Sequence, residues 1–307
     1  MKRKHLEIFF RTSLSIVFLL LILYKVGDIR KALEIACNIP LWTLAAAVFL
    51  YFFSYIISSY RWQILFDREN KPALAFLLRK NLIALFFNNI LPTAIGGDVY
   101  RGLSIKRYGF STVFMERLVG FSAVALLSVA GLYYIKENAL LKKMSILLII
   151  FAILIMMFYL IIFIPKFALM FIRFFRKIKI FNIGKELSRF WVHLSRFRKR
   201  KIDLLKVFII SILYQLVVVI INLILGYALG IEIPFLVYCT GVSLVAIVTS
   251  LPSIGGIGFR EGGYYILVTM ISGKTSEEAF AFSTVIFALT LFGGLTGSIL
   301  YLTERKK

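Results

Sequence analysis

The chain has few of the residues that build disulfide frameworks and metal sites. Cys37 and Cys239 are its only cysteines, they lie far apart, and neither belongs to a CxxC pattern. His5 and His193 are the only histidines, and each lies in a basic segment. These spacings exclude a disulfide framework and match no thiolate or imidazole metal site. The sequence therefore predicts no metal and no cofactor.

Acidic residues and long polar stretches are also scarce. Only 15 Asp and Glu residues stand against 37 Lys and Arg residues, a net charge of +22. Nucleic-acid binding would account for this charge, but a membrane protein accounts for it more simply, because basic loops hold the cytoplasmic side and face anionic lipid. The longest polar-rich stretch, about 166–203, is far too short for a soluble catalytic domain. We expect anionic membrane lipids as partners and no nucleic acid.

Apolar residues dominate instead, at 60% of the chain with a mean hydropathy of +0.89. Runs of about 20 apolar residues, each long enough to cross about 30 Å of hydrocarbon, recur from end to end. The predicted fold is an all-α integral membrane protein with about six full transmembrane helices and two helices broken by Gly and Pro. The full spans are expected at 8–24, 41–60, 111–134, 144–164, 205–229 and 279–302. The chain then forms one membrane domain, 1–307: a first half, 1–164, with the broken segment 73–105; a basic segment, 165–204; and a second half, 205–307, with the broken segment 235–271.

The two broken segments share a motif. Residues 91–101 read Leu-Pro-Thr-Ala-Ile-Gly-Gly-Asp-Val-Tyr-Arg, and residues 251–260 read Leu-Pro-Ser-Ile-Gly-Gly-Ile-Gly-Phe-Arg. Helix breakers and ionised groups thus recur in two apolar segments at matching positions of the two halves. Such a pair is the best indication in a sequence of a transporter's binding site.

The distribution of positive charge predicts the topology. If both broken segments are re-entrant, the cytoplasmic pieces, among them 61–72, carry 25 Lys and Arg residues and the outer pieces carry 7. If both segments crossed fully, the basic stretch 165–206 would lie outside, against the positive-inside rule. Both termini are then cytoplasmic, and the two broken segments enter from opposite sides as an inverted repeat.

The motif chemistry indicates a phosphate site. Pro92 and Pro252 interrupt helical hydrogen bonding, and the glycines after them permit a new helix start, which favours an anion. An arginine follows each glycine pair and offers a planar fork suited to phosphate. The candidate phosphate-binding residues are Arg101, Arg260, Gly96, Gly97, Gly255 and Gly256. The alternative for each copy alone is helix packing, but duplication with an arginine in register favours function, because charge in hydrocarbon costs at least about 2.5 kcal/mol.

Other polar groups accompany the arginines. Asp98 and Glu261 either couple protons or hold the arginines, and both alternatives remain open. Glu116 and Arg117 belong to the same candidate set, although an interfacial structural pair is the favoured interpretation there. The remaining candidates line the site or satisfy the broken backbone: Asn88, Asn89, Thr93 and Ser253.

The basic segment and the last span carry simpler patterns. Residues 166–201 contain 12 Lys and Arg residues and one acid, with apolar residues at helical spacing. This predicts an interfacial amphipathic helix or helix pair, broken near Asn182–Gly184. Gly293-x-x-x-Gly297 indicates close helix packing.

The motifs together resemble a known family. Asn-Asn-x-Leu-Pro-x-x-x-Gly-Gly-Asp-x-x-Arg at 88–101, Glu-Arg at 116–117 and Leu-Pro-x-x-Gly-Gly-x-Gly-x-Arg-Glu-Gly at 251–262 are similar to the lysylphosphatidylglycerol synthase transmembrane-region family. The resemblance covers nearly the whole chain and implies a flippase-like protein of the prokaryotic cytoplasmic membrane. An archaeal branch linked to dolichol-phosphate sugar chemistry keeps an enzyme alternative open. The soluble aminoacyl-transfer domain of the bifunctional members is missing, so lysyl-lipid synthesis by this chain alone is not expected.

The sequence therefore predicts translocation of a phosphate-bearing lipid, of phospholipid or polyprenyl-phosphate type. The alternatives are a membrane glycosyltransferase that uses a polyprenyl-phosphate sugar, with Glu261 or Asp98 as base, and an accessory subunit of a separate lipid-modifying enzyme. A homo-oligomer is compatible with all three.

Overall fold

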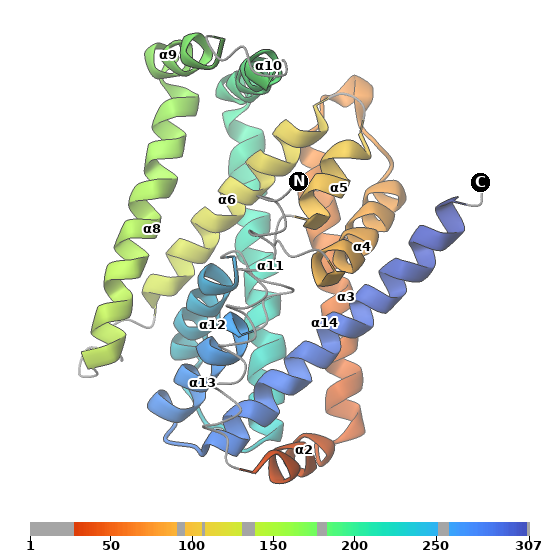
Figure 1. Cartoon of the computed structure of the whole chain (residues 1–307), viewed down its shortest axis with the longest axis vertical. Coiled ribbons are helices and arrows are strands. Elements are labelled where there is room, and N and C mark those ends of the chain that lie inside the picture. The colour runs from red at the N-terminus through yellow and green to blue at the C-terminus, as the bar shows by residue number, and fades with distance from the viewer. Residues whose placement is uncertain are drawn as a thin grey trace, which may run out of the picture.

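The computed structural model describes residues 28–90, 96–105, 108–130, 139–176, 183–250 and 258–305, and every regular element in these ranges is a helix (Figure 1). Within these ranges, five helices are long and apolar enough to cross a membrane. They are α3 (Leu41–Ile64), α6 (Gly109–Ala130), α8 (Ala139–Phe163), α11 (Lys201–Ala228) and α14 (Ser276–Arg305). The prediction of an all-α membrane protein is confirmed, and the predicted first span, 8–24, lies outside the described residues.

The two broken segments form two helical hairpins. The first consists of α4 (Leu74–Ile90) and α5 (Gly96–Leu103), and the second of α12 (Phe235–Thr249) and α13 (Phe259–Ile271). In each hairpin the two helices pack against each other. The breaks themselves, 91–95 and 251–257, lie outside the described residues.

The hairpins point in opposite directions. The first joins α3 to α6 at one end of the molecule, and the second joins α11 to α14 at the other end (Figure 1). Each hairpin also packs on the helix that follows the other one: α4 lies along α14, and α12 lies along α6. α3 and α11, which precede the hairpins, pack together. The two halves therefore interlock, and the prediction that the hairpins are re-entrant in a bilayer remains a prediction.

Close helix approach depends on glycine at a few positions. A Cβ on Gly293 would lie 2.7 Å from the Tyr51 ring, and one on Gly297 would overlap the backbone of α4 at Leu82. The glycine pattern in the last span thus allows α14 to pack closely on α3 and α4, as the GxxxG spacing predicts.

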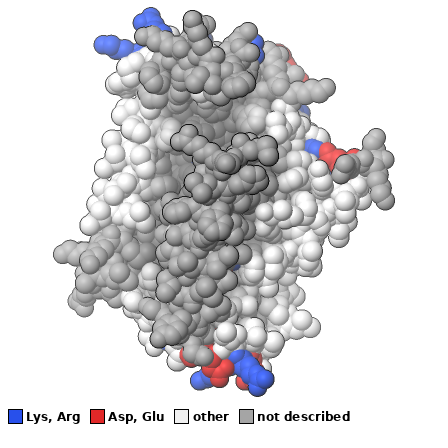
Figure 2. Space-filling view, in the orientation of Figure 1, with Lys and Arg blue, Asp and Glu red and all other residues white. Residues whose placement is uncertain are grey.

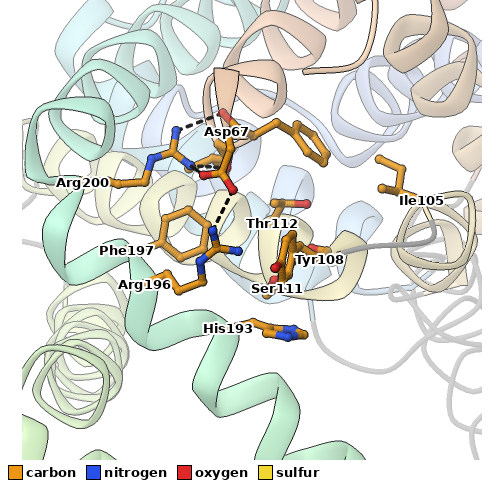
Figure 3. Close-up of a pocket in the computed structure, with 11 residues that line it drawn as sticks. Asp67, Ile105, Tyr108, Ser111, Thr112, His193, Arg196, Phe197 and Arg200 are labelled. Carbon is orange, nitrogen blue, oxygen red and sulfur yellow. Dashed lines mark hydrogen bonds and ion pairs between the residues drawn. The ribbon is translucent and has the colours of Figure 1, made fainter. Parts of the chain in front are cut away.

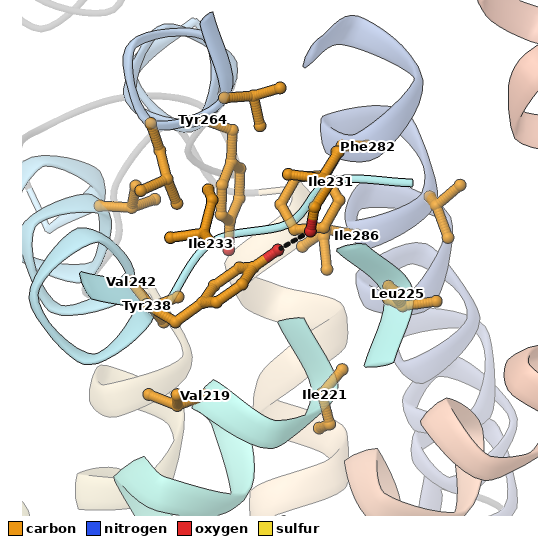
Figure 4. Close-up of a cluster of buried hydrophobic side chains, with 14 of the residues drawn as sticks. Val219, Ile221, Leu225, Ile231, Ile233, Tyr238, Val242, Tyr264, Phe282 and Ile286 are labelled. Carbon is orange, nitrogen blue, oxygen red and sulfur yellow. Dashed lines mark hydrogen bonds between the residues drawn. The ribbon is translucent and has the colours of Figure 1, made fainter. Parts of the chain in front are cut away.

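An apolar cluster packs the second hairpin against α11 and α14 (Figure 4). Tyr238 of α12 is fully buried there, and its hydroxyl donates to the carbonyl of Ile231 at 3.3 Å. Tyr264 of α13 packs edge-on against Phe282 of α14 with ring centroids 5.1 Å apart. This cluster fixes α13 and so the arginine at its start.

Short amphipathic helices lie at the two ends. α2 (Ile29–Cys37) lies at one end, and α9 (Pro165–Arg176), α10 (Ile183–Ser195) and the 3-10 turn η3 (Arg196–Lys199) lie at the other (Figure 1). The basic segment is thus a helix pair; Ile183 and Gly184 already belong to α10, and the rest of the expected break lies outside the described residues. On the face that Figure 2 draws, the coloured charged residues lie mostly at the two ends, and the described surface between them is almost uncharged. Apolar side chains of α8 are exposed in this belt, as expected for contact with lipid tails: Ile149, Ile153 and Met156.

One predicted boundary is wrong. The cytoplasmic piece 61–72 was expected to begin at residue 61, but α3 continues to Ile64 and Arg61 is buried within it. Arg61 is therefore an internal charge and not one of the basic loop residues.

Candidate anion site

A cavity of about 430 Å³ lies between the two hairpins and the long helices, and we call it the central cavity. Both hairpins contribute to its wall, together with α3, α6, α11 and α14. The charged residues among the described lining are Arg61, Asp98, Arg101, Glu116, Arg117 and Arg260. Positively charged groups from both repeated motifs thus face one space, which is within the volume range of ligand pockets.

Glu116 is the centre of the charge network on the first hairpin's side. Its side chain is 1% exposed, and its Oε1 accepts from Arg61 Nη2 at 2.6 Å and from Ser58 at 3.3 Å. Its other oxygen pairs with Arg101 Nη2. A carboxylate buried this deeply is stable only when paired, so Glu116 ties α3, α5 and α6 together.

Asp98 links two further arginines. Its Oδ1 lies 3.3 Å from Arg101 Nη1, which confirms that these two residues share a helix face, and its Oδ2 accepts from Arg117 Nε at 2.6 Å. The Arg117 side chain remains 40% exposed, whereas that of Arg101 is 8% exposed. Glu116 and Arg117 are therefore not an interfacial pair with each other, because each bonds a residue of α5 and lines the cavity.

The second hairpin holds its arginine differently. Arg260 Nη2 and Nε both bond Oε1 of the next residue, Glu261, at 2.6 and 3.1 Å. The other carboxylate oxygen of Glu261 accepts from the Gly258 backbone N–H at 2.6 Å and caps the start of α13. Gly258 has a φ of 87°, which favours glycine. Glu261 thus holds the arginine and the helix start together.

The start of α5 is capped by a neutral group. Gly97 N–H donates to Asn88 Oδ1 at 2.8 Å, and a Cβ on Gly97 would lie 2.7 Å from the same oxygen. Asn89 Nδ2 donates to the Thr290 carbonyl at 3.1 Å. Both asparagines line the cavity and satisfy backbone groups at once. Gly96 is buried at the first position of α5, and the candidates Thr93, Ser253, Gly255 and Gly256 lie outside the described residues.

A second, smaller pocket of about 120 Å³ lies where η3 meets the end of α3 (Figure 3). Arg200 donates to three carbonyls there, of Ile64, Leu65 and Phe66, at 2.7 to 3.1 Å. Asp67 accepts from Arg196 at 2.8 Å and from Arg200 at 3.3 Å. These bonds fasten the basic helix pair to the bundle, so we interpret this pocket as structural.

Sequence reasoning missed several residues of the central cavity. Arg61 follows Ser54 and Ser58 on one face of an otherwise apolar helix, and this polar stripe is the signal that could have identified it. Gln215 of α11 is 4% exposed and lines the same cavity. The cavity wall also contains tyrosines that the sequence does not distinguish from the other aromatic residues of their apolar runs: Tyr51, Tyr55, Tyr214 and Tyr264.

The central cavity is suited to an anion. Its described lining contains four arginines and two carboxylates, Asp98 and Glu116. In the part of the chain that the structure describes, no group of three or more His, Cys, Asp or Glu side chains converges as metal ligands would. The guanidinium groups are also pre-positioned by stacking, with Arg101 4.2 Å from the Trp62 ring and Arg260 4.5 Å from the Phe287 ring. The described lining thus places more guanidinium groups than carboxylates around one space, which suits an anion of phosphate size.

Residues 8–297 match the family described as the lysylphosphatidylglycerol synthase TM region. The chain belongs to this family. The match covers nearly the whole chain, so the resemblance that the motifs predicted is confirmed, and with the five apolar helices it identifies a multi-pass membrane protein. Searches of the curated proteins and of the solved structures found no match to this chain.

Proposed function

We propose that this protein translocates the head group of a phosphate-bearing lipid across the cytoplasmic membrane while the lipid tails stay in the bilayer. The observation that carries the proposal is the central cavity, where both oppositely directed hairpins contribute an arginine to one space. Membership in a family named for the membrane region of a lipid-modifying enzyme supports a lipid-related role.

Arg101 and Arg260 are proposed to bind the phosphate, with Asp98 and Glu261 holding them in place. In a bilayer the hairpins would be re-entrant, and any non-helical backbone at that depth requires protein or water around it. The central cavity between the hairpins offers room for such water. Two inverted hairpins that share one site are the arrangement expected for alternating access from the two sides.

Glycosyl transfer is less well supported. It would need Asp98 or Glu261 as a base, and each of these carboxylates accepts from an arginine. Each would therefore have to release an arginine before it could bond the hydroxyl of a sugar acceptor.

Reconstitution tests the proposal. Purified protein in proteoliposomes should move fluorescent phosphatidylglycerol between leaflets, measured by chemical bleaching of the outer leaflet. Arg101→Lys and Arg260→Lys should slow this transport while the melting temperature changes little, because lysine keeps the charge but loses the planar fork. Translocation no faster than in protein-free vesicles would contradict the proposal. Native mass spectrometry of co-purified lipid identifies the lipid to test next.

A further inference from the structure

The two carboxylates in the described lining of the central cavity are already paired, and so is Glu261, which bonds the lining residue Arg260. Glu116 accepts from Arg61 and Arg101, Asp98 from Arg101 and Arg117, and Glu261 from Arg260. A cationic head group would need an open carboxylate, because an unpaired buried charge is costly. None of these three carboxylates offers one without first losing an arginine.

Donors, in contrast, remain available. Gln215 is 4% exposed, and within the described residues its Nε2 has no hydrogen-bond partner. Arg101 Nε is likewise buried without a partner there. Arg117 uses only its Nε in the bonds described, to Asp98, and its side chain stays 40% exposed at the cavity. Unsatisfied buried donors favour a ligand that brings oxygen acceptors.

The two helix breaks contribute neither arginine nor carboxylate side chains. Residues 91–95 are Leu-Pro-Thr-Ala-Ile, and residues 251–257 are Leu-Pro-Ser-Ile-Gly-Gly-Ile, so neither break contains an ionisable side chain. The sequence of the breaks therefore adds no carboxylate to set against the excess of arginine in the described lining.

We infer that the central cavity selects lipids with a net anionic, oxygen-rich head group and rejects cationic aminoacylated head groups. This inference rests on the proposed translocation and adds the substrate class to it. Arg117 is the specificity-determining residue, because its side chain is 40% exposed. The side chains of the other three cavity arginines are 7 to 10% exposed. Arg117 repels a positively charged head group and attracts a negatively charged one, so both repulsion and attraction contribute to the selectivity.

The test compares three lipids in the same proteoliposomes. Fluorescent phosphatidylglycerol has one negative charge, phosphatidylethanolamine has no net charge, and lysyl-phosphatidylglycerol has one net positive charge. Phosphatidylglycerol should cross at least about tenfold faster than the lysyl lipid, a difference of about 1.4 kcal/mol, with phosphatidylethanolamine between them. Equal rates for the three would overturn the selectivity but leave translocation intact. Movement of none of them would contradict the proposed function itself.

Variants at Arg117 locate the selectivity. Arg117→Gln should reduce the ratio between the two extreme lipids to about twofold, and Arg117→Lys should preserve most of it, since charge decides the ratio. Arg173→Gln is the matched control, because it removes one positive charge from an exposed position on α9, outside the cavity lining. If Arg173→Gln lowers the ratio as much as Arg117→Gln, surface attraction of anionic lipid explains the preference and the inference fails. If Arg117→Gln does not fold, the wild-type ratio and the Arg117→Lys ratio still decide.

Discussion

The two hairpins deliver an arginine to the same cavity by different means. Arg101 belongs to a network that spans α3, α5 and α6 and joins three arginines to two carboxylates. Arg260 is held by its own neighbour in the chain, one arginine to one carboxylate. The first hairpin therefore depends on tertiary packing and carries an excess positive charge, whereas the second is local and neutral. The two copies of the motif thus share an arginine but differ in the residues that hold it.

The largest expected effect is the all-or-none labelling of a cysteine, which tests from which side of the membrane the second hairpin enters. Cys37 is exposed on α2, at the end from which the second hairpin enters, and Cys239 is buried. If that end faces outside, an impermeant maleimide should label wild-type protein in intact cells, and Cys37→Ser should abolish labelling. Labelling of Cys37 only after the cells are lysed would place α2 in the cytoplasm and contradict the predicted orientation.

The next effect concerns stability. Glu116→Ala leaves two buried arginines without their shared carboxylate, and it should lower the free energy of unfolding by about 3–5 kcal/mol. Glu261→Ala should cost less, because it frees a single arginine at the start of one helix. Thermal unfolding in detergent compares the two variants. Equal losses would mean that the first hairpin's network is no more important to the fold than the local pair.

The same contrast explains what could be predicted from the sequence. Pro, Gly-Gly and Arg lie within short segments, so the hairpins and the Asp98–Arg101 contact follow from local spacing. The Arg260–Glu261 pair is also local. Arg61 is 55 residues from Glu116, and only the packing of α3 on the rest of the bundle brings them together. In the sequence, an arginine near the end of an apolar run cannot be distinguished from a loop residue. The structure shows that α3 continues past Arg61.

A double variant tests whether Arg260 of the second hairpin binds phosphate or only neutralises Glu261. Arg260→Ala leaves Glu261 buried without its arginine and should cost about 2 kcal/mol. Adding Glu261→Gln removes that charge but keeps an oxygen for the Gly258 N–H, so stability should return. If Arg260 binds phosphate, lipid transport should stay impaired in the double variant. Recovery of both the melting temperature and transport would show that Arg260 only neutralises Glu261.

The smallest effect lies at the helix starts, where the hairpins use a neutral and a charged cap. Asn88→Ala removes the acceptor for Gly97 N–H and should cost about 1 kcal/mol. Asn88→Asp keeps that oxygen, so the melting temperature should stay near that of the wild type. The added negative charge faces the central cavity, however, so transport of phosphatidylglycerol should slow, because the site's attraction for an anion falls. Glu261→Gln is the reciprocal change, since it makes the second cap neutral while keeping its oxygen. If Asn88→Asp transports phosphatidylglycerol as fast as the wild type does, the charge beside the first hairpin does not govern binding, and the two hairpins differ only in how they are folded.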